Sequence, residues 1–237
     1  MDHWFFLDWP SVLAITYYRS NTVILVLFGP PGCGKGTQSA RLATEINGQV
    51  LSTGDLFRQR IAQSDPLAQK LRAILSAGEL VSDELVIQML LPEIHRVQAA
   101  KQHVILDGFP RTLVQAQSLD QAGNVSPNQV IVFDVPDDEI VDRITGRLVH
   151  PQSGRVYHQR FNPPKKPQID DVTGQKLVQR EDDQPQTVKR RIATYHKNTQ
   201  PIINYYQEQN TIISQIDGTG PVNQVTDRLM QVIHSAS

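Results

Sequence analysis

The strongest chemical signal in the sequence is a glycine-rich stretch with one lysine, Gly29-Pro30-Pro31-Gly32-Cys33-Gly34-Lys35-Gly36-Thr37. Glycines let backbone N–H groups approach phosphate oxygens closely, and Lys35 adds a full positive charge. The stretch predicts a loop that binds the phosphate chain of a nucleotide; the alternative is a glycine-rich turn that binds nothing. In the general phosphate-loop pattern a hydroxyl residue follows the lysine directly. Here Gly36 separates Lys35 from Thr37, so the pattern by itself does not predict a Mg²⁺ contact from this hydroxyl.

A second group of polar residues follows another apolar run. Val104-Ile105-Leu106-Asp107 is interpreted as a strand ending in a carboxylate, the position at which phosphate-loop proteins hold an aspartate for Mg²⁺. Capping of the next helix is the alternative role for Asp107. Arg111 follows at the same sheet edge, and further arginines that could contact phosphate are Arg58, Arg143, Arg147, Arg180 and Arg191. Taken singly, each arginine is more often a solvated surface side chain.

The elements that must position these residues alternate between strand and helix. Strands are predicted at 23–28, near 49–51, at 103–107, 129–134 and 212–216. This order predicts an α/β three-layer fold with a parallel five-stranded sheet covered on both faces. In such open folds, ligands bind at the carboxyl ends of the strands. The glycine loop and Asp107 are therefore expected at one edge.

Helical spacing and cap residues predict four helices outside the long connections. They are expected at 38–46, at 82–97 with a kink at Pro92, at 184–209 with a cap from Asp182-Asp183 and a bend at Pro201, and at 221–233. Residues 52–81 are too long for a loop and indicate a small helical insertion. Residues 146–183, with a strand-like segment at 155–157, indicate a separate lobe.

Composition excludes several classes of protein. The 237 residues carry 23 Lys and Arg against 24 Asp and Glu, a net charge of -1, which argues against a nucleic-acid-binding face. Cys33 is the single cysteine, so an internal disulfide and a cysteine-based zinc site are excluded and a reducing cytoplasm is favoured.

Residues 1–22 differ from the rest of the chain. They are rich in aromatic residues, but no basic residue precedes the apolar part and Asp2 and Asp8 interrupt it. This excludes a secretory signal and a membrane span, so no membrane partner is expected. We interpret the segment as an N-terminal extension outside the main pattern; the alternative is an interfacial or partner-binding helix.

Taken together, the motifs resemble those of the adenylate kinase family. The resemblance rests on residues 29–37 (GPPGCGKGT), 52–55 (STGD), 106–112 (LDGFPRT), 142–147 (DRITGR), 154–158 (GRVYH) and 180–183 (REDD). The order Lys-Gly-Thr after the loop glycines also fits this family. The resemblance runs from Val23 to the C-terminus and implies a core at 23–237, with an NMP-binding insertion at 52–81 and a long lid at 146–183.

The resemblance implies transfer of the terminal phosphoryl group from Mg²⁺-ATP to AMP, reversibly giving two ADP, by a monomer. It implies catalytic roles for Lys35, Arg111, Arg147, Arg180 and Arg191. It implies ATP binding by Gly32, Cys33, Gly34, Lys35, Gly36, Thr37, Arg143, Arg147, Val156, Tyr157 and Gly220. It implies AMP binding by Thr53, Arg58, Glu79, Leu80, Val81, Gly108, Phe109, Pro110, Arg111, Gln115, Arg180 and Arg191. Another acceptor such as UMP or CMP, GTP as donor, or a noncatalytic nucleotide-binding module remain as alternatives.

Two further expectations concern the lid and the glycine loop. Lids of some relatives hold zinc on four cysteines, and here the corresponding positions are His150, Ser153, Asp170 and Thr173. Because hydroxyls are poor zinc ligands, we predict a hydrogen-bonded cluster without structural zinc. Cys33 lies beside a helix N-terminus, which suggests alkylation that ATP prevents; the alternative is a small residue without a role.

Overall fold

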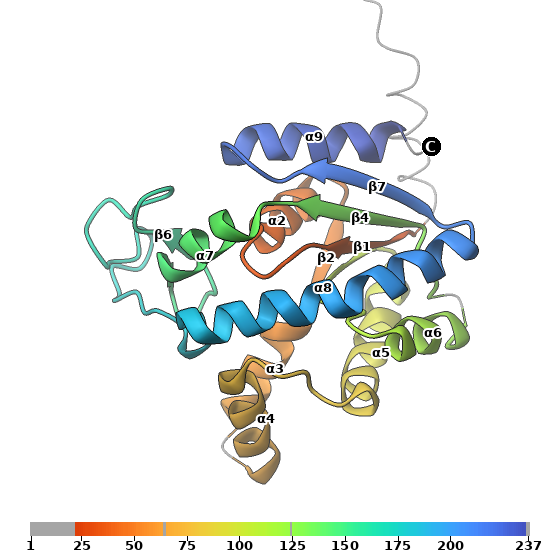
Figure 1. The fold of residues 1–237 in the computed structure, drawn as a ribbon, viewed down its shortest axis with the longest axis horizontal. Helices are drawn as coiled ribbons and strands as arrows, with labels where there is room; N and C mark the ends of the chain where they lie inside the picture. Colours follow the sequence, from red (N-terminus) through yellow and green to blue (C-terminus); the bar gives the residue numbers. More distant parts are fainter. Residues whose placement is uncertain (1–21, 64, 124, 236–237) are drawn as a thin grey trace, which may run out of the picture.

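The computed structural model describes residues 22–63, 65–123 and 125–235 (Figure 1). The predicted extension at 1–22 lies outside the described residues except for Thr22. No helix in the described ranges is long and apolar enough to cross a membrane.

The centre of the fold is a parallel sheet of five strands in the order β2-β3-β1-β4-β7. The strands are β1 (Ile24–Phe28), β2 (Gly48–Ser52), β3 (His103–Asp107), β4 (Gln129–Asp134) and β7 (Ile212–Asp217). The predicted sheet is confirmed, since these bounds agree with the five expected apolar segments. The middle strand β1 is buried at every residue, which explains its unbroken apolar sequence.

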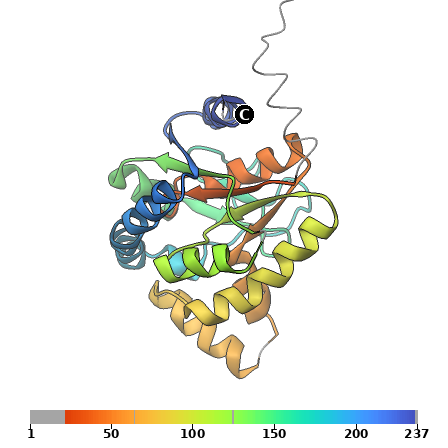
Figure 2. The same cartoon turned by 90° about the vertical axis from the view of Figure 1, so that its right-hand side faces the viewer.

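Successive β1 side chains enter two separate hydrophobic clusters because they alternate across the sheet. Val26 packs in the cluster that includes α5 (Asp83–Ala99) and α6 (Leu113–Gln121). Leu27 packs in the cluster that includes α2 (Lys35–Glu45), α7 (Asp137–Thr145) and α9 (Val222–Ser235). Figures 1 and 2 show α9 on one side of the sheet and α5 and α6 on the other. The predicted three-layer arrangement is therefore present.

The long helix α8 (Pro185–Glu208) contributes to both clusters, with Val188 and Ile192 in one and Ile202 and Tyr206 in the other.

The predicted cap from Asp182 and Asp183 is wrong. The residue that precedes α8 is Gln184, and both carboxylates instead accept hydrogen bonds from arginine side chains. Sequence reasoning also did not delimit α6 and α7. Thr112, whose hydroxyl accepts from the Gln115 backbone N–H, was the available signal for α6.

Two segments extend beyond the three layers. The first consists of α3 (Thr53–Ile61), where the Ser52 hydroxyl accepts from the Asp55 N–H, and α4 (Pro66–Ala77). The second contains the antiparallel pair β5 (Arg147–Val149) and β6 (Val156–His158), followed by the short 3₁₀ helix η1 (Glu181–Asp183). Figure 1 shows α3 and α4 projecting from the sheet and the β6 lobe extending past α7.

Candidate active site

A cavity of about 1240 Å³ lies between the carboxyl ends of β1 and β3, the α3–α4 insertion and the β5–β6 lobe. It collects the cationic side chains that the sequence analysis selected from distant parts of the chain. All seven line its wall: Lys35, Arg58, Arg111, Arg143, Arg147, Arg180 and Arg191. A volume of this size exceeds that of most single small-molecule sites.

The glycine loop at the end of β1 forms one wall and needs its glycines. Gly32 has φ +83°, and a Cβ there would lie 2.4 Å from Cγ1 of Ile144. Gly34, with φ +103°, directly precedes α2, so the backbone N–H groups of this helix start face the cavity side of the sheet. A larger residue at Gly32 would push α7 away from the loop.

Lys35 is held by the loop that precedes it. Its ammonium donates to the Gly29 carbonyl at 2.6 Å and to the Pro30 carbonyl at 3.0 Å. Cys33 lies beneath this contact and is only 1% exposed. The structure therefore does not support the proposed alkylation of Cys33, since a reagent would first have to displace the loop.

Asp107, at the end of β3, lies close to the start of α2. A Cβ added to Gly36 would be 3.7 Å from Oδ2 of Asp107. Asp107, Gly36 and Thr37 all line the cavity. An oxygen donor at this place suits Mg²⁺, which keeps several waters and binds through one or two carboxylates plus substrate phosphates. No group of three or more His, Cys, Asp or Glu in the described ranges could hold a metal ion by itself.

On the opposite wall, Gly108 joins two of the residues predicted to bind AMP. Its carbonyl accepts from the Thr53 hydroxyl at 2.9 Å and from Nε of Arg111 at 2.8 Å. Gly108 has φ +81°, and a Cβ there would come within 2.9 Å of Nη2 of Arg111. The positive φ favours glycine at this position.

Most of the other residues predicted for nucleotide binding also line the cavity. These are Gly220, Val156 and Tyr157 from the ATP set, and Glu79, Leu80, Val81, Pro110 and Gln115 from the AMP set. Phe109 does not line it. Its side chain is 1% exposed and packs in the hydrophobic cluster with α5 and α6.

Acidic partners fix four of the arginines, and sequence reasoning missed this pairing. Arg58 pairs with Asp55 at 2.5 Å. Nε of Arg147 donates to Asp183 at 2.9 Å, and a second nitrogen of the same guanidinium contacts the other carboxylate oxygen. Arg191 pairs with Asp182, and Arg143 pairs with Glu139. The adjacent acids after Arg180 were a signal for ion pairing, but only the fold shows which arginine each one binds.

The site holds more positive charge than its acids balance. Arg111 is exposed to the cavity yet lies deep in the molecule, and loss of bulk water together with nearby Arg191 lowers its pKa to about 10. Desolvation, with repulsion from Arg58 and Arg147, likewise lowers the pKa of Arg180 to about 10. Both remain cations at neutral pH. Crowded cations of this kind match a highly anionic ligand.

Several cavity residues had not been selected from the sequence. His158 and Phe161 stack with ring centroids 4.5 Å apart, and both line the cavity beside Arg143. The His158 Nδ1 accepts from two backbone N–H groups, while burial lowers its pKa. Arg72, on α4, also faces the cavity. His158 is the last residue of the motif 154–158 but was given no role, and nothing in the spacing of Phe161 or Arg72 distinguished them from surface side chains.

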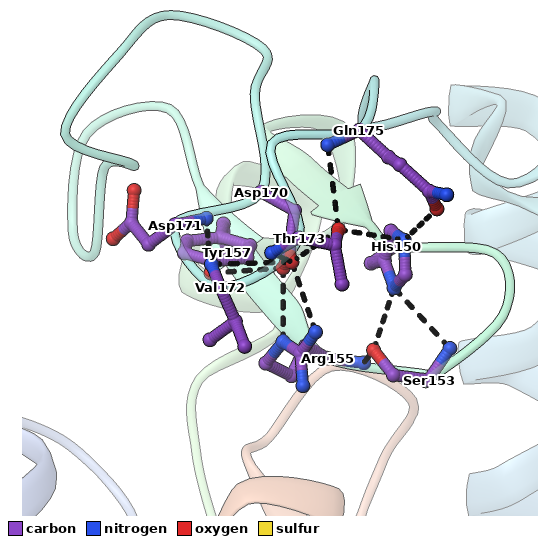
Figure 3. Close-up of polar contacts among 9 residues, drawn as sticks. All are labelled: His150, Ser153, Arg155, Tyr157, Asp170, Asp171, Val172, Thr173 and Gln175. Atoms are coloured by element: carbon purple, nitrogen blue, oxygen red, sulfur yellow. Dashed lines mark hydrogen bonds and ion pairs between the residues drawn. The ribbon is translucent and has the colours of Figure 1, made fainter.

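The four lid residues predicted to form a cluster lie together (Figure 3). His150 bonds through Nδ1 to the Ser153 hydroxyl at 2.7 Å, and its Nε2 lies 3.2 Å from the Thr173 hydroxyl. The Thr173 hydroxyl donates to Asp170 at 2.8 Å. Gln175, which was not predicted, contacts Nε2 of His150 at 2.7 Å.

Asp170 is the most connected residue of this lobe (Figure 3). It accepts two bonds of 2.9 Å from Arg155 and one of 3.0 Å from the Tyr157 hydroxyl, as well as backbone N–H groups. The bond from Arg155 is the main reason why the pKa of Asp170 lies far below 3.8. The hydroxyl of Tyr157 is thus engaged inside the lobe, and only the rest of this 8% exposed side chain can contribute to the cavity wall.

Replacing Asp170 by asparagine is expected to loosen the lobe without unfolding the core. The amide cannot accept all of these bonds, and it loses the ion pair with Arg155. Amides of 146–183 should exchange hydrogen at least about tenfold faster, while those of β1 keep their protection. Because the pKa of Asp170 is depressed, the wild-type contribution is present above pH 3.8 and is lost only well below it.

The matched control for this experiment is Asp171→Asn, a neighbouring carboxylate on the exposed side of the same turn. Its Oδ1 accepts from the Lys165 backbone N–H at 2.8 Å, and asparagine can keep this bond, so the exchange pattern should stay close to that of the wild type. Equal protection of the lobe in the Asp170 and Asp171 variants would show that the Asp170 contacts do not hold it together.

Comparison with known proteins gives concordant matches. A family model described as "Adenylate kinase" matches residues 27–211. A protein of Yarrowia lipolytica named adenylate kinase is 47% identical over 191 residues, which is 79% of this chain and 76% of that protein. Proteins with the same name from Malassezia globosa (42%, covering 91% of this chain and 86% of its own length) and Sclerotinia sclerotiorum (44%, covering 90% and 78%) are also similar.

Proposed function

Because this chain belongs to the adenylate kinase family, we propose that its large cavity binds ATP and AMP together and that its cationic wall carries the transfer between them. The reaction of the chain is that of the family: the terminal phosphoryl group of ATP passes to AMP, reversibly, giving two ADP. The observation that carries the site assignment is the convergence of Lys35 and six arginines between the glycine loop and the two insertions.

The ATP side is the wall formed by residues 32–37 and the lid. Backbone N–H groups at the start of α2 and the Lys35 ammonium would bind the phosphate chain. Arg143 is held by the Cys33 and Gly218 carbonyls, and its flat guanidinium lies where the adenine of ATP could stack on it. The His158–Phe161 pair offers a second flat surface nearby.

The AMP side is the wall formed by α3, α4 and the loop after β3. Arg58 and Arg111 would bind the AMP phosphate, with Thr53 and the residues 79–81 around the sugar and base. Gln115 would contact the adenine edge, since an amide donates and accepts at once. Arg180, Arg191 and Arg147 approach from the lid side and would stabilise the phosphoryl group in transit.

This arrangement suits phosphoryl transfer, in which negative charge spreads over the oxygens of a loose transition state. Forked guanidiniums and the Lys35 ammonium stabilise that charge and hold donor and acceptor in line. No side chain needs to act as a base. Closure of both insertions would exclude water, which would otherwise accept the phosphoryl group.

The residues present fit the Mg²⁺ that the family uses with ATP. Asp107 would hold the ion, mainly through water, beside the Thr37 hydroxyl and the nucleotide phosphates. When bound, the ion neutralises charge on the phosphate oxygens. We further propose that the protein is a monomer and that its lid holds no structural zinc. Because Cys33 is the single cysteine, we also propose a reducing compartment such as the cytoplasm. Stoichiometric zinc in the purified protein would refute the zinc-free lid.

A coupled assay that compares nucleoside monophosphates as acceptors and ATP with GTP as donor tests this function. We expect Mg²⁺-dependent turnover with ATP and AMP, giving two ADP for each AMP consumed. Turnover with UMP or CMP in place of AMP would assign the other monophosphate kinases. Nucleotide binding with no turnover on any acceptor would indicate a noncatalytic module.

A further inference from the structure

The Gln115 side chain is held at both ends by the protein. The backbone N–H of Arg111 donates to its Oε1 at 2.7 Å, and its Nε2 donates to Oδ1 of Asp83 at 2.8 Å. Gln115 is 2% exposed and lines the cavity. Asp83 does not line the cavity; it lies in the first turn of α5.

These two contacts fix which end of the amide is oxygen and which is nitrogen. A backbone N–H can only donate, and a carboxylate can only accept. If the amide turned over, its NH₂ group would face the Arg111 N–H and its oxygen would face Asp83. Both contacts would become repulsive, and buried polar groups would lose their partners.

Asp83 is itself held in place by a second contact. The Thr112 hydroxyl donates to the same Oδ1 at 2.9 Å, and it accepts from the Gln115 backbone N–H at 3.1 Å. Asp83 therefore joins the start of α5 to the start of α6, which carries Gln115. Asp83, Thr112 and Gln115 thus form a closed ring of hydrogen bonds.

We propose that Asp83 is a positioning residue that sets the base specificity of the AMP side by locking the amide of Gln115. This inference rests on the proposed placement of the AMP base at Gln115. After its protein contacts, the amide keeps one lone pair and one N–H for a ligand, in a fixed order. Adenine presents an exocyclic N–H donor and a ring nitrogen acceptor along one edge. The hypoxanthine of IMP presents an acceptor and a donor in the reverse order.

An amide held at both ends matches only one of these two edges in a given pose of the base. An amide held at one end only can turn over more readily and match either edge. The lock therefore rejects IMP, and by the same logic the 6-oxo edge of GMP. Rejection arises because the wrong base would leave buried polar groups unpaired.

The experiment measures kcat/KM for AMP and for IMP in the wild type and in Asp83→Ala. In this variant only the backbone N–H of Arg111 still opposes turning of the amide, so we expect the preference for AMP over IMP to fall about tenfold, through KM for the monophosphate. The kcat with AMP and the KM for ATP should stay within about twofold. Asp83→Asn keeps an oxygen that can accept from Gln115 and should recover part of the preference.

Glu84→Ala is the matched control. It removes the adjacent carboxylate from the same first turn of α5, but Glu84 is exposed. It should keep the preference of the wild type, which separates the Gln115 contact from the general effect of charge at this helix start.

Gln115→Leu separates the two levels of the inference. Loss of kcat/KM for AMP in this variant, with an unchanged preference in Asp83→Ala and Asp83→Asn, would overturn the role of Asp83 alone. Unchanged kcat/KM for AMP in Gln115→Leu would instead refute the placement of the base at Gln115.

Discussion

Replacing Lys35 by methionine is expected to reduce kcat by about 10³-fold, the largest effect that the structure predicts for one side chain. The reason is that Lys35 is the cation held on the glycine loop itself, where the phosphate chain of ATP is proposed to bind. Removing one preorganised donor to a transition state typically costs about 10²–10³ in kcat, and the loss of a full charge belongs at the upper end. Steady-state kinetics with ATP and AMP provide the measurement.

Two further variants make this result specific. Lys35→Arg keeps the charge but replaces a compact ammonium with a wide fork, so it should recover little activity. Lys101→Met removes an exposed lysine beside the amino end of β3, far from the carboxyl ends that face the cavity, and should leave kcat unchanged. A Lys35→Met protein that folds normally and keeps more than about a tenth of the wild-type kcat would contradict the proposed role.

Replacing Arg180 by methionine is expected to have two opposite effects. Phosphoryl transfer should fall by about 10²-fold or more, because a guanidinium proposed to stabilise the transferred group is lost. The nucleotide-free protein should nevertheless become more stable, with Tm higher by about 2–4 °C. In the described part of the chain, the buried Nε of Arg180 has no hydrogen-bond partner, and Arg58 and Arg147 repel its charge.

The direction of the stability effect follows from the lowered pKa of Arg180. Its pKa is about 10 in the folded protein, below the ordinary value of the free side chain, so folding disfavours the charged form. The cost is present at every pH below about 10 and is relieved only as the pH rises from there toward the ordinary pKa of a free arginine. The comparison of Tm therefore belongs at neutral pH, where the full cost applies.

The control for Arg180 is Arg96→Met, which removes an exposed arginine paired with Glu93 on α5. Its activity and Tm should stay close to those of the wild type. Saturating nucleotide should raise the Tm of the wild type more than that of Arg180→Met, since a polyanion relieves the repulsion only where the cation is present. A lower Tm for nucleotide-free Arg180→Met would refute the idea that this site stores unfavourable charge.

The sequence determined the central sheet, because unbroken apolar runs are typical of parallel strands that are covered by helices on both faces. It also determined the glycine loop, since positive φ at Gly32 and Gly34 is open to glycine and costly for most other residues. Both signals are local, so each could be recognised within a few residues of chain.

The tertiary structure decided how charged groups pair. Asp182 and Asp183 looked like a helix cap, because a carboxylate before a helix is the usual local arrangement. In the fold, Asp183 instead pairs with Arg147, which lies 36 positions earlier in the chain. Asp182 pairs with Arg191. A charge-assisted pair with arginine outweighs a single contact to a backbone N–H.

Phe109 and Gln115 show the same division between local and distant information. The family resemblance implied AMP binding by both residues, but Phe109 is buried among α5 side chains and does not line the cavity. The contact of Gln115 with Asp83, 32 positions earlier, exists only because α5 and α6 begin side by side. The sequence determined which side chains are proposed to carry the chemistry. The tertiary structure decided how they are oriented, because orientation depends on partners brought together from distant parts of the chain.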